Sequence, residues 1–328
     1  MTDRGLFEEC VGEREIEGRV YRSDVRAARK RLAGRVRKTP VFHTSVLGPN
    51  GPVPVTLKLE YLQHGGTFKV RGSLNALLES GHSADQVVIA SGGNAGIAAA
   101  LAAAQLGKRC TVVVPESAPH TKVAAMWSYG AEVLWHGTTY VEARRYAQEL
   151  AVERGALQLH AYDMPAVVAG AGVIGLELAE QVRGRPPVLA GVGGGSLIAG
   201  VAAALGRRQP VIGIEPEGVP ALHAALAAHR PVQVRAAGRG AEVLGATTIG
   251  GLALDVAARY GVRSLLVTDD AIVTARDYLW REFRIVVEFS GATAFAAIQS
   301  GAYVPARGER PVVVLCGANT DLDIGSAS

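Results

Sequence analysis

Cysteine is scarce in this 328-residue sequence. The three cysteines, Cys10, Cys110 and Cys316, are far apart and odd in number. This excludes a disulfide framework and a cysteine-based zinc motif. Because such sparse use of cysteine fits a reducing compartment, we expect a cytoplasmic protein.

Long apolar runs and concentrated charge are also missing. The longest apolar stretches, such as residues 97–104, are too short to span a bilayer, and residues 1–15 are charged, unlike a secretory signal. The formal net charge is only +4. The one dense basic stretch, residues 26–38, has the spacing of an exposed helix face. We therefore expect neither a membrane nor a nucleic acid as partner.

Lysine is rare as well, with 6 lysines against 28 arginines and none in the second half of the chain. The six are Lys30, Lys38, Lys58, Lys69, Lys108 and Lys122. Any chemistry that needs an amine has few candidates.

What the sequence does contain is the pattern of an α/β protein. Short β-branched runs alternate with long alanine-rich segments, as strands and crossover helices do in a parallel sheet. We expect strands at residues 53–60, 86–90, 109–114, 132–135, 188–192, 211–214, 264–268 and 312–315. We expect helices at residues 94–106, 121–129, 140–154, 166–182, 197–205 and 269–283. Ligands bind at the carboxyl ends of such strands, and three of these ends carry unusual sequence at residues 91–94, 193–196 and 316–319.

The glycine run at residues 193–196 leads from a strand into a helix. Amides at a helix N-terminus bind anions, most often phosphate, although a tight turn without a ligand has the same sequence. Gly191-x-Gly193-x-x-Ser196 also nearly matches a dinucleotide fingerprint, with Glu215 ending the next strand. Serine replaces the third glycine there. A nicotinamide-binding Rossmann protein therefore stays open as an alternative.

Two further segments carry reactive or polar groups. Lys69 follows Phe68 among glycines and hydroxyls, which fits either a surface lysine at a helix start or an amine in an aromatic-walled pocket. In such a pocket desolvation lowers the pKa of the amine and favours a Schiff base. Residues 90–96 form a loop of amides and short polar side chains suited to a carboxylate. With the glycine run, these segments indicate an amino-acid substrate and a phosphorylated carbonyl cofactor.

Four motifs stand in the order and spacing of the fold-type II pyridoxal-phosphate enzymes. They are Thr-Phe-Lys-Val-Arg-Gly at 67–72, Ser-Gly-Gly-Asn at 91–94, Gly-Gly-Gly-Ser-Leu at 193–197 and Cys-Gly-Ala-Asn at 316–319. The chain most resembles the serine/threonine dehydratase branch, from about residue 35 to residue 321, with Glu-Pro at 215–216 and Glu-Phe-Ser-Gly-Ala at 288–292 included.

The resemblance implies a fold similar to that of tryptophan synthase β. Two open, mostly parallel sheets would be wrapped by helices, with pyridoxal 5'-phosphate between two domains. The large cofactor-binding domain would comprise residues 1–61 and 166–328. The small domain, residues 62–165, would carry the Ser-Gly-Gly-Asn loop. A homodimer is the expectation for this family.

The resemblance also assigns roles to residues of this chain. Lys69 would bind the cofactor as a Schiff base and later remove the α-proton of the substrate. Phe68 would pack on the cofactor ring, and Asn94 would hydrogen-bond its hydroxyl oxygen. The phosphate would be held by Gly193, Gly194, Gly195, Ser196 and Leu197, and the substrate carboxylate by Ser91, Gly92, Gly93 and Ala95. Cys316 would face the ring nitrogen.

A thiol at Cys316 favours one reaction type over others. Unlike an aspartate, it cannot keep the pyridine ring protonated, so a fully developed carbanion is less stabilised. Early loss of a β-leaving group suits such a site. We therefore expect α,β-elimination of water from a small β-hydroxy amino acid such as serine or threonine, which gives a 2-keto acid and ammonia. A β-replacement synthase similar to cysteine synthase is the alternative.

Three departures from related enzymes sharpen this expectation. Racemases of the family place a serine where this chain has Gly92, so racemisation by that route is not expected. The divalent-cation site of the racemase-like branch is matched at Glu215, but its aspartate is replaced by Ala221. We expect no divalent metal, whereas backbone carbonyls leave a monovalent cation open. Because the sequence ends soon after residue 321, we do not expect the effector control that a regulatory domain gives to allosteric threonine dehydratases.

Overall fold

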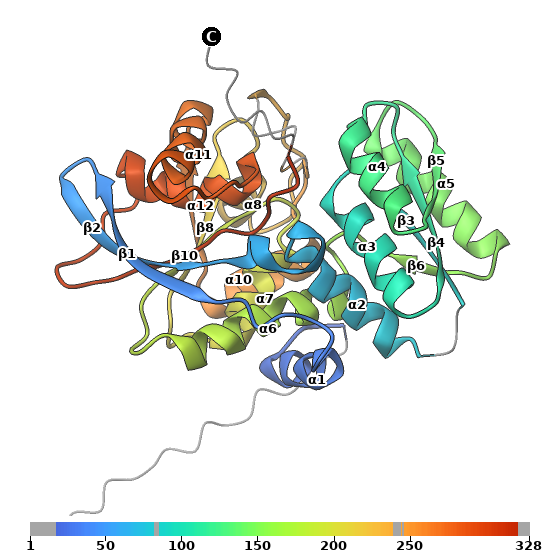
Figure 1. Ribbon diagram of the computed structural model, residues 1–328, viewed down its shortest axis with the longest axis horizontal. Coiled ribbons are helices and arrows are strands. Elements are labelled where there is room, and N and C mark those ends of the chain that lie inside the picture. Colours follow the sequence, from blue (N-terminus) through green and yellow to red (C-terminus); the bar gives the residue numbers. More distant parts are fainter. Residues whose placement is uncertain (1–17, 82–84, 239–243, 245, 321–328) are drawn as a thin grey trace, which may run out of the picture.

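The computed structural model describes residues 18–81, 85–238, 244 and 246–320. Their strands form two separate sheets, each with helices on both faces (Figure 1). The larger sheet has the strand order β1-β2-β10-β7-β8-β9, and the smaller has the order β5-β4-β3-β6. All neighbouring strands are parallel except the β1–β2 hairpin. The expected class of two open, mostly parallel sheets is confirmed.

The elements have the following bounds. The strands are β1 (Val41–Gly48), β2 (Gly51–Lys58), β3 (Gln86–Ala90), β4 (Arg109–Val114), β5 (Glu132–Trp135), β6 (Leu157–Leu159), β7 (Val188–Gly191), β8 (Val211–Pro216), β9 (Arg263–Val267) and β10 (Val312–Val314). The helices are α1 (Arg22–Leu32), η1 (Glu60–Leu62), η2 (His64–Gly66), α2 (Lys69–Glu79), α3 (Asn94–Gln105), α4 (His120–Ser128), α5 (Tyr140–Glu153), α6 (Pro165–Gln181), α7 (Ser196–Leu205), α8 (Ala221–Ala228), α10 (Gly251–Tyr260), α11 (Asp269–Phe283) and α12 (Phe289–Ser300). No helix among these is long and apolar enough to cross a bilayer.

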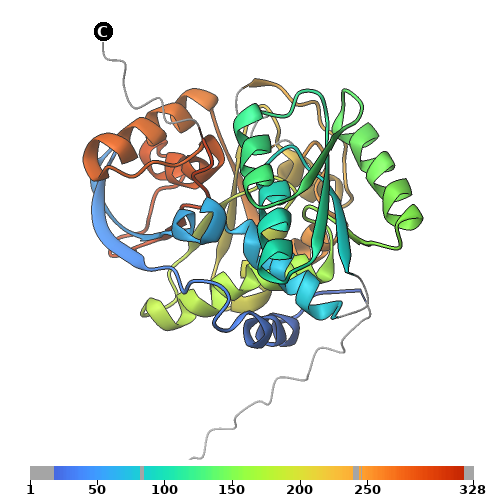
Figure 2. The same ribbon diagram turned by 45° about the vertical axis from the view of Figure 1, so that its right-hand side comes forward.

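Three apolar cores hold the layers together. One lies between α11, α12 and the larger sheet, and a second lies between α5 and the smaller sheet. The third and largest is continuous from the first helix, α1, through α2, α6 and α7 to α3 and the other face of the smaller sheet. Figure 2 shows α3 and α5 on opposite faces of that sheet. Because α2 packs against both α3 and α6, it joins the two halves of the molecule.

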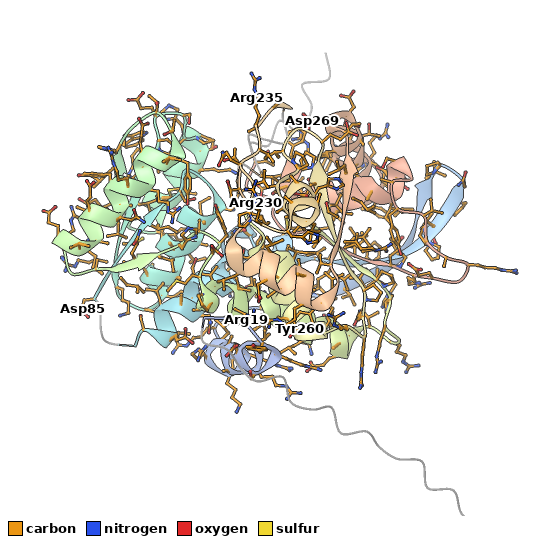
Figure 3. All side chains as sticks on the ribbon, turned by 180° about the vertical axis from the view of Figure 1, so that it is seen from behind. Arg19, Asp85, Arg230, Arg235, Tyr260 and Asp269 are labelled. Atoms are coloured by element: carbon orange, nitrogen blue, oxygen red, sulfur yellow. The ribbon has the colours of Figure 1, made fainter. Side chains whose placement is uncertain are left out.

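The first helix differs from the expectation for the basic stretch at residues 26–38. It ends at Leu32, since Gly34 takes the left-handed backbone conformation with φ 73°. The segment before it is tied to α10, where Arg19 Nε lies 3.1 Å from Asp255 Oδ1. Figure 3 shows Arg19 near Tyr260 at the end of α10.

Candidate active site

A cavity of about 440 Å³ lies where the carboxyl ends of strands from both sheets meet. Its walls bring together four segments that are far apart in the sequence. They include the predicted residues Phe68, Lys69, Ser91, Gly92, Gly93, Asn94, Ala95, Gly193, Gly194, Gly195, Ser196, Leu197 and Cys316. Of the predicted site residues, Glu215 alone is not among the residues that form this cavity.

Lys69 is the first residue of α2, and its half-buried side chain lines the cavity. Its Nζ atom donates hydrogen bonds to Ala161 O at 3.0 Å and to Ser196 Oγ at 3.3 Å. Nζ also lies 5.2 Å from the centre of the Phe68 ring. Burial lowers the pKa of Lys69 to about 8. The amine is therefore much more nucleophilic near neutral pH than an exposed lysine would be.

The backbone before Lys69 is anchored to the end of β10. Phe68 N–H donates to Cys316 O at 3.1 Å, and Thr67 forms an isolated bridge with Gly317. These contacts bring Lys69 and Cys316 to the same cavity, although the two residues are far apart in the chain.

A buried cluster of charged side chains anchors helix α2. Arg71 donates to Glu60 at 2.9 Å and to Glu177 at 2.8 Å, and Lys58 Nζ lies 2.6 Å from Glu177. Arg71, Lys58 and Glu60 have no exposed side-chain surface. Burial alone would raise the pKa of Glu60, but the Arg71 charge holds it below its ordinary value. Removing one member would leave an uncompensated buried charge.

Close helix packing fixes the same region. A Cβ atom on Gly170 of α6 would lie 2.4 Å from Arg71 O, so only glycine allows α2 and α6 to approach this far. Together, the charge cluster and this contact leave α2 little freedom to shift, which keeps Lys69 at the cavity wall.

The glycine loop forms a tight cradle at the start of α7. Gly195 adopts φ 95°, a left-handed conformation that favours glycine. A Cβ on Gly194 would lie 2.1 Å from Cγ of Tyr162, whose ring therefore rests directly on the loop. The amides at this helix start and the buried Ser196 hydroxyl provide donors for an anion such as phosphate.

The loop at residues 91–95 lies at the end of β3 and leads into α3. Ser91 Oγ accepts a hydrogen bond from Gly93 N–H at 3.2 Å, which folds the loop on itself. A Cβ on Gly92 would lie 2.9 Å from Ala118 Cβ. The loop thus packs closely against the 115–119 segment and presents amides at the helix start.

Cys316 carries a neutral thiol. Its Sγ atom donates to Ser290 O at 3.3 Å, and the residue is 4% exposed. Burial, with the nearby charge of Glu288 as a second cause, raises the pKa of Cys316 to about 12. The group expected to face a cofactor ring nitrogen therefore stays protonated at physiological pH.

The Glu215 carboxylate makes its hydrogen bonds within the protein. Its carboxylate accepts hydrogen bonds from Leu222 N–H at 2.7 Å, His223 N–H at 2.9 Å and Ser264 Oγ at 2.6 Å. It thus serves as an acceptor for the start of α8. Within the part of the chain that the structure describes, no cluster of metal-ligating side chains is present.

Several cavity residues were missed from the sequence, notably Tyr140, Tyr162 and Lys122. Tyr162 lies in the turn at residues 160–163, and its ring lines the cavity. In this turn His160 Nδ1 accepts from Asp163 N–H at 2.8 Å, and burial lowers the pKa of His160 to about 4. From the segment at residues 241–248, Leu244 and Ala246 also line the cavity. Residues 241–243 and 245 lie outside the described residues.

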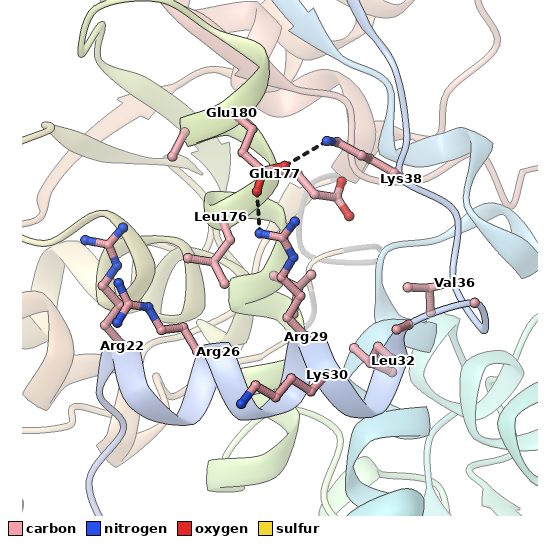
Figure 4. Close-up of a pocket in the computed structure, with 14 residues that line it drawn as sticks. Arg22, Arg26, Arg29, Lys30, Leu32, Val36, Lys38, Leu176, Glu177 and Glu180 are labelled. Atoms are coloured by element: carbon pink, nitrogen blue, oxygen red, sulfur yellow. Dashed lines mark hydrogen bonds and ion pairs between the residues drawn. The ribbon is translucent and has the colours of Figure 1, made fainter.

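A larger cavity, of about 680 Å³, lies between α1 and α6, and none of the predicted site residues lines it (Figure 4). Its polar wall is an exposed ion-pair cluster in which Lys38 lies 2.7 Å from Glu180, which Arg29 also contacts. The volume of a cavity therefore does not identify the candidate site by itself, because the predicted site residues line the smaller of the two cavities.

Comparison with known proteins agrees with this geometry. Residues 32–317 match the family described as pyridoxal-phosphate dependent enzyme. The chain is 34% identical over 303 residues to an L-threonine ammonia-lyase of Geobacter sulfurreducens, covering 91% of this chain and 75% of the relative. It is 33% identical to the catabolic L-threonine dehydratase of Escherichia coli, covering 91% and 93%.

Solved structures show the same likeness. The threonine deaminase of T.th. has a TM-score of 0.83 and 32% identity, covering 92% of this chain and 99% of that one. Maize serine racemase has a TM-score of 0.85 and 27% identity, covering 93% and 95%. The expected resemblance to the serine/threonine dehydratase branch is confirmed, and the chain belongs to the pyridoxal-phosphate-dependent enzyme family.

Proposed function

We propose that this protein removes water from threonine or serine, giving a 2-keto acid and ammonia, with pyridoxal phosphate as cofactor. One observation carries the proposal. The half-buried Lys69 amine, with its pKa lowered to about 8, lies in the same cavity as the glycine loop and the 91–95 loop. Relatives that cover nearly all of this chain are named threonine dehydratases and ammonia-lyases.

The residues fit the cofactor. The start of α7 offers amides and the Ser196 hydroxyl to a phosphate, and Phe68 offers an aromatic wall. When bound, pyridoxal phosphate supplies an electron-withdrawing ring that stabilises negative charge at the α-carbon of the substrate. Lys69 is the amine that would hold it, and Asn94 the side chain that would contact its ring hydroxyl.

The chain's own residues then account for elimination. Once free, the Lys69 amine is the base placed to take the α-proton, since its lowered pKa leaves it substantially unprotonated near pH 8. The loop at residues 91–95 would hold the substrate carboxylate through its amides and Ser91. The neutral Cys316 thiol gives no strong charge support to the ring nitrogen, which favours early departure of the β-hydroxyl.

Two other functions have less support. Racemases of this family carry a serine where Gly92 packs on Ala118, and glycine donates no side-chain proton. In a dinucleotide-binding protein Glu215 would contact a ribose, yet this residue is fully buried and its carboxylate is already hydrogen-bonded to α8 and Ser264. A β-replacement synthase would share the cofactor site, and the assay below separates it.

The proposal includes a domain division and an assembly. The small domain would comprise residues 62–165, with the large domain formed by 1–61 and 166–328; β3 to β6 all fall within the small domain.

A cytoplasmic homodimer is proposed, and the exposed apolar side chains of Phe42 and Leu47 on the edge strand β1 support an interface there. Light scattering of the purified protein tests the dimer. A monovalent cation held by backbone carbonyls is also proposed, tested by exchanging sodium for potassium.

The function is tested by the visible spectrum of the purified protein and by keto-acid release from serine, threonine and other β-hydroxy amino acids. A yellow protein that releases keto acid from threonine or serine supports the proposal. A yellow protein that forms products only with an added thiol or amine indicates β-replacement, and a colourless protein that binds no added pyridoxal phosphate overturns the proposal.

A further inference from the structure

Lys122 and Glu288 form an ion pair across the cavity. Lys122 is the third residue of α4, beside the smaller sheet, whereas Glu288 directly precedes α12, on the larger sheet. Lys122 Nζ lies 3.2 Å from Glu288 Oε2, and the two side chains are 15% and 3% exposed. Neither residue was singled out from the sequence as a site residue, although Glu288 begins one of the quoted motifs.

The Glu288 carboxylate does more than pair with Lys122. Its Oε1 atom accepts hydrogen bonds from Asn94 Nδ2 and, at 2.7 Å, from Ser290 Oγ. A Cβ on Gly317 would lie 2.5 Å from Oε1, so glycine at this position leaves room for the carboxylate.

The orientation of the Asn94 amide follows from these contacts. Because Glu288 Oε1 can only accept while ionised, Asn94 must turn Nδ2 toward it. Asn94 Oδ1 then accepts from Asn319 Nδ2 at 2.9 Å, and Asn319 also donates to Gly65 O at 2.8 Å. The second hydrogen on Asn94 Nδ2 is left for another acceptor, which is the role proposed for Asn94 toward the cofactor ring oxygen.

Glu288 needs a positive partner to keep this arrangement. Burying a carboxylate in a side chain that is 3% exposed is costly without a nearby opposite charge. Lys122 supplies that charge and comes from the opposite side of the cavity. The same contact therefore joins the two sheets and places a positive charge beside the buried Glu288 carboxylate.

We propose that the Lys122–Glu288 ion pair is a positioning device that closes the two halves of the molecule over the cavity and orients Asn94 toward the cofactor. This inference rests on the proposed cofactor site for its second part only. Lys122 and Glu288 are positioning residues, since each acts through Asn94 and through closure of the cavity.

The first test uses the cofactor-free enzyme and the Cys316 thiol as a reporter of opening. Cys316 is buried in the cavity wall, and Cys110 is buried in β4 of the smaller sheet. Each protein is treated with a thiol reagent, and modified peptides are quantified by mass spectrometry. Lys122→Met should modify Cys316 roughly tenfold faster than the wild type does, whereas Cys110 should react at an unchanged rate.

Matched variants distinguish the loss of the Lys122–Glu288 ion pair from a general destabilisation of the fold. Lys122→Arg retains the charge and should stay within about threefold of the wild type. Arg154→Met breaks an exposed ion pair with Glu132 inside the smaller-sheet half and should change neither cysteine. Lys122→Met combined with Glu288→Gln should react no faster than the faster single variant, because both remove one interaction.

The second test is a titration of each cofactor-free variant with pyridoxal phosphate, followed by absorbance. Lys122→Met should bind about tenfold more weakly, and Lys122→Arg should restore most of the affinity. Wild-type rates at Cys316 in Lys122→Met, equal acceleration at Cys110, or no rescue by arginine would each overturn the proposal. If the wild type binds no cofactor, the proposed function fails, whereas the thiol experiment still decides the ion pair.

Discussion

The Nζ atom of Lys69 lies 3.3 Å from the Oγ atom of Ser196. Lys69 begins α2, and Ser196 begins α7, so the proposed reactive amine and the proposed phosphate cradle are in direct contact. The Ser196 hydroxyl accepts from the amine, and its own hydrogen remains available for an anion seated at the start of α7. A single buried hydroxyl therefore links the two ends of the cofactor site.

Replacing Ser196 with alanine should weaken anion binding without displacing Lys69. The amine retains its bond to Ala161 O, whereas a phosphate loses one hydrogen bond to a charged acceptor, so affinity should fall about tenfold. Titration with pyridoxal phosphate, and competition by inorganic phosphate, measures the change. Ser128→Ala removes an exposed hydroxyl at the end of α4 and serves as the control. Unchanged affinity in Ser196→Ala would contradict the assignment.

Lys69→Ala should abolish elimination. Loss of the positioned base alone removes about 10²- to 10⁴-fold in rate, and loss of covalent attachment adds to this. Keto-acid release and the visible spectrum are the two measurements, and both signals should disappear together. Lys30→Ala, at an exposed position of α1, should behave as the wild type does. Retention of keto-acid formation by Lys69→Ala would require another base.

Cofactor attachment should depend on pH with a midpoint near 8. Burial lowers the pKa of Lys69 from 10.5 to about 8, and only the neutral amine attacks a carbonyl. The rate of attachment to the cofactor-free enzyme should therefore be half-maximal near pH 8 and level off about one pH unit higher. Stopped-flow absorbance between pH 6 and pH 10 checks this. A rate still rising toward pH 10 would indicate an amine with an ordinary pKa.

The same pKa shift affects the stability of the cofactor-free enzyme. Between about 8 and 10.5 the unfolded chain holds a proton on Lys69 that the folded chain has lost. Stability should therefore gain a contribution as pH rises through this window, and the full penalty of burying a protonated amine should apply below it. Comparison with Lys69→Met in urea unfolding isolates the contribution of Lys69, since the variant lacks the titrating group.

Two glutamates on α6 should differ greatly in their effect on stability. Glu177→Gln leaves the buried Lys58 and Arg71 with only one carboxylate partner and should lower the free energy of unfolding by about 3–5 kcal/mol. Glu180 is 40% exposed and pairs with Arg29 and Lys38 (Figure 4), so Glu180→Gln should change it by less than about 1 kcal/mol. Urea denaturation measures both, and equal effects would contradict the role of the cluster.

Strands and motifs within one segment were predictable from the sequence. The expected strands at residues 86–90, 109–114 and 132–135 coincide with β3, β4 and β5 because each is a short β-branched run between turn residues. The reactive lysine stood out since lysine is rare and the motif around it specific. In contrast, β1 was missed because its residues are mostly exposed and lack a clear alternating pattern.

Contacts between distant segments were not predictable in this way. Lys122 and Glu288 are 166 residues apart, and neither local sequence indicates the other. The Tyr162 ring on Gly194 is a similar case, because its position depends on how the two sheets face each other. Local pattern thus locates groups along the chain, whereas their pairing depends on the tertiary fold.

The first residues of α2, α3 and α7 all line one cavity, so three helices point their amino ends at it. Each helix macrodipole places about half a positive charge there. The resulting field attracts a molecule that carries several negative groups and opposes one whose side chain is cationic. We therefore expect the helix dipoles by themselves to disfavour an amino acid with a basic side chain.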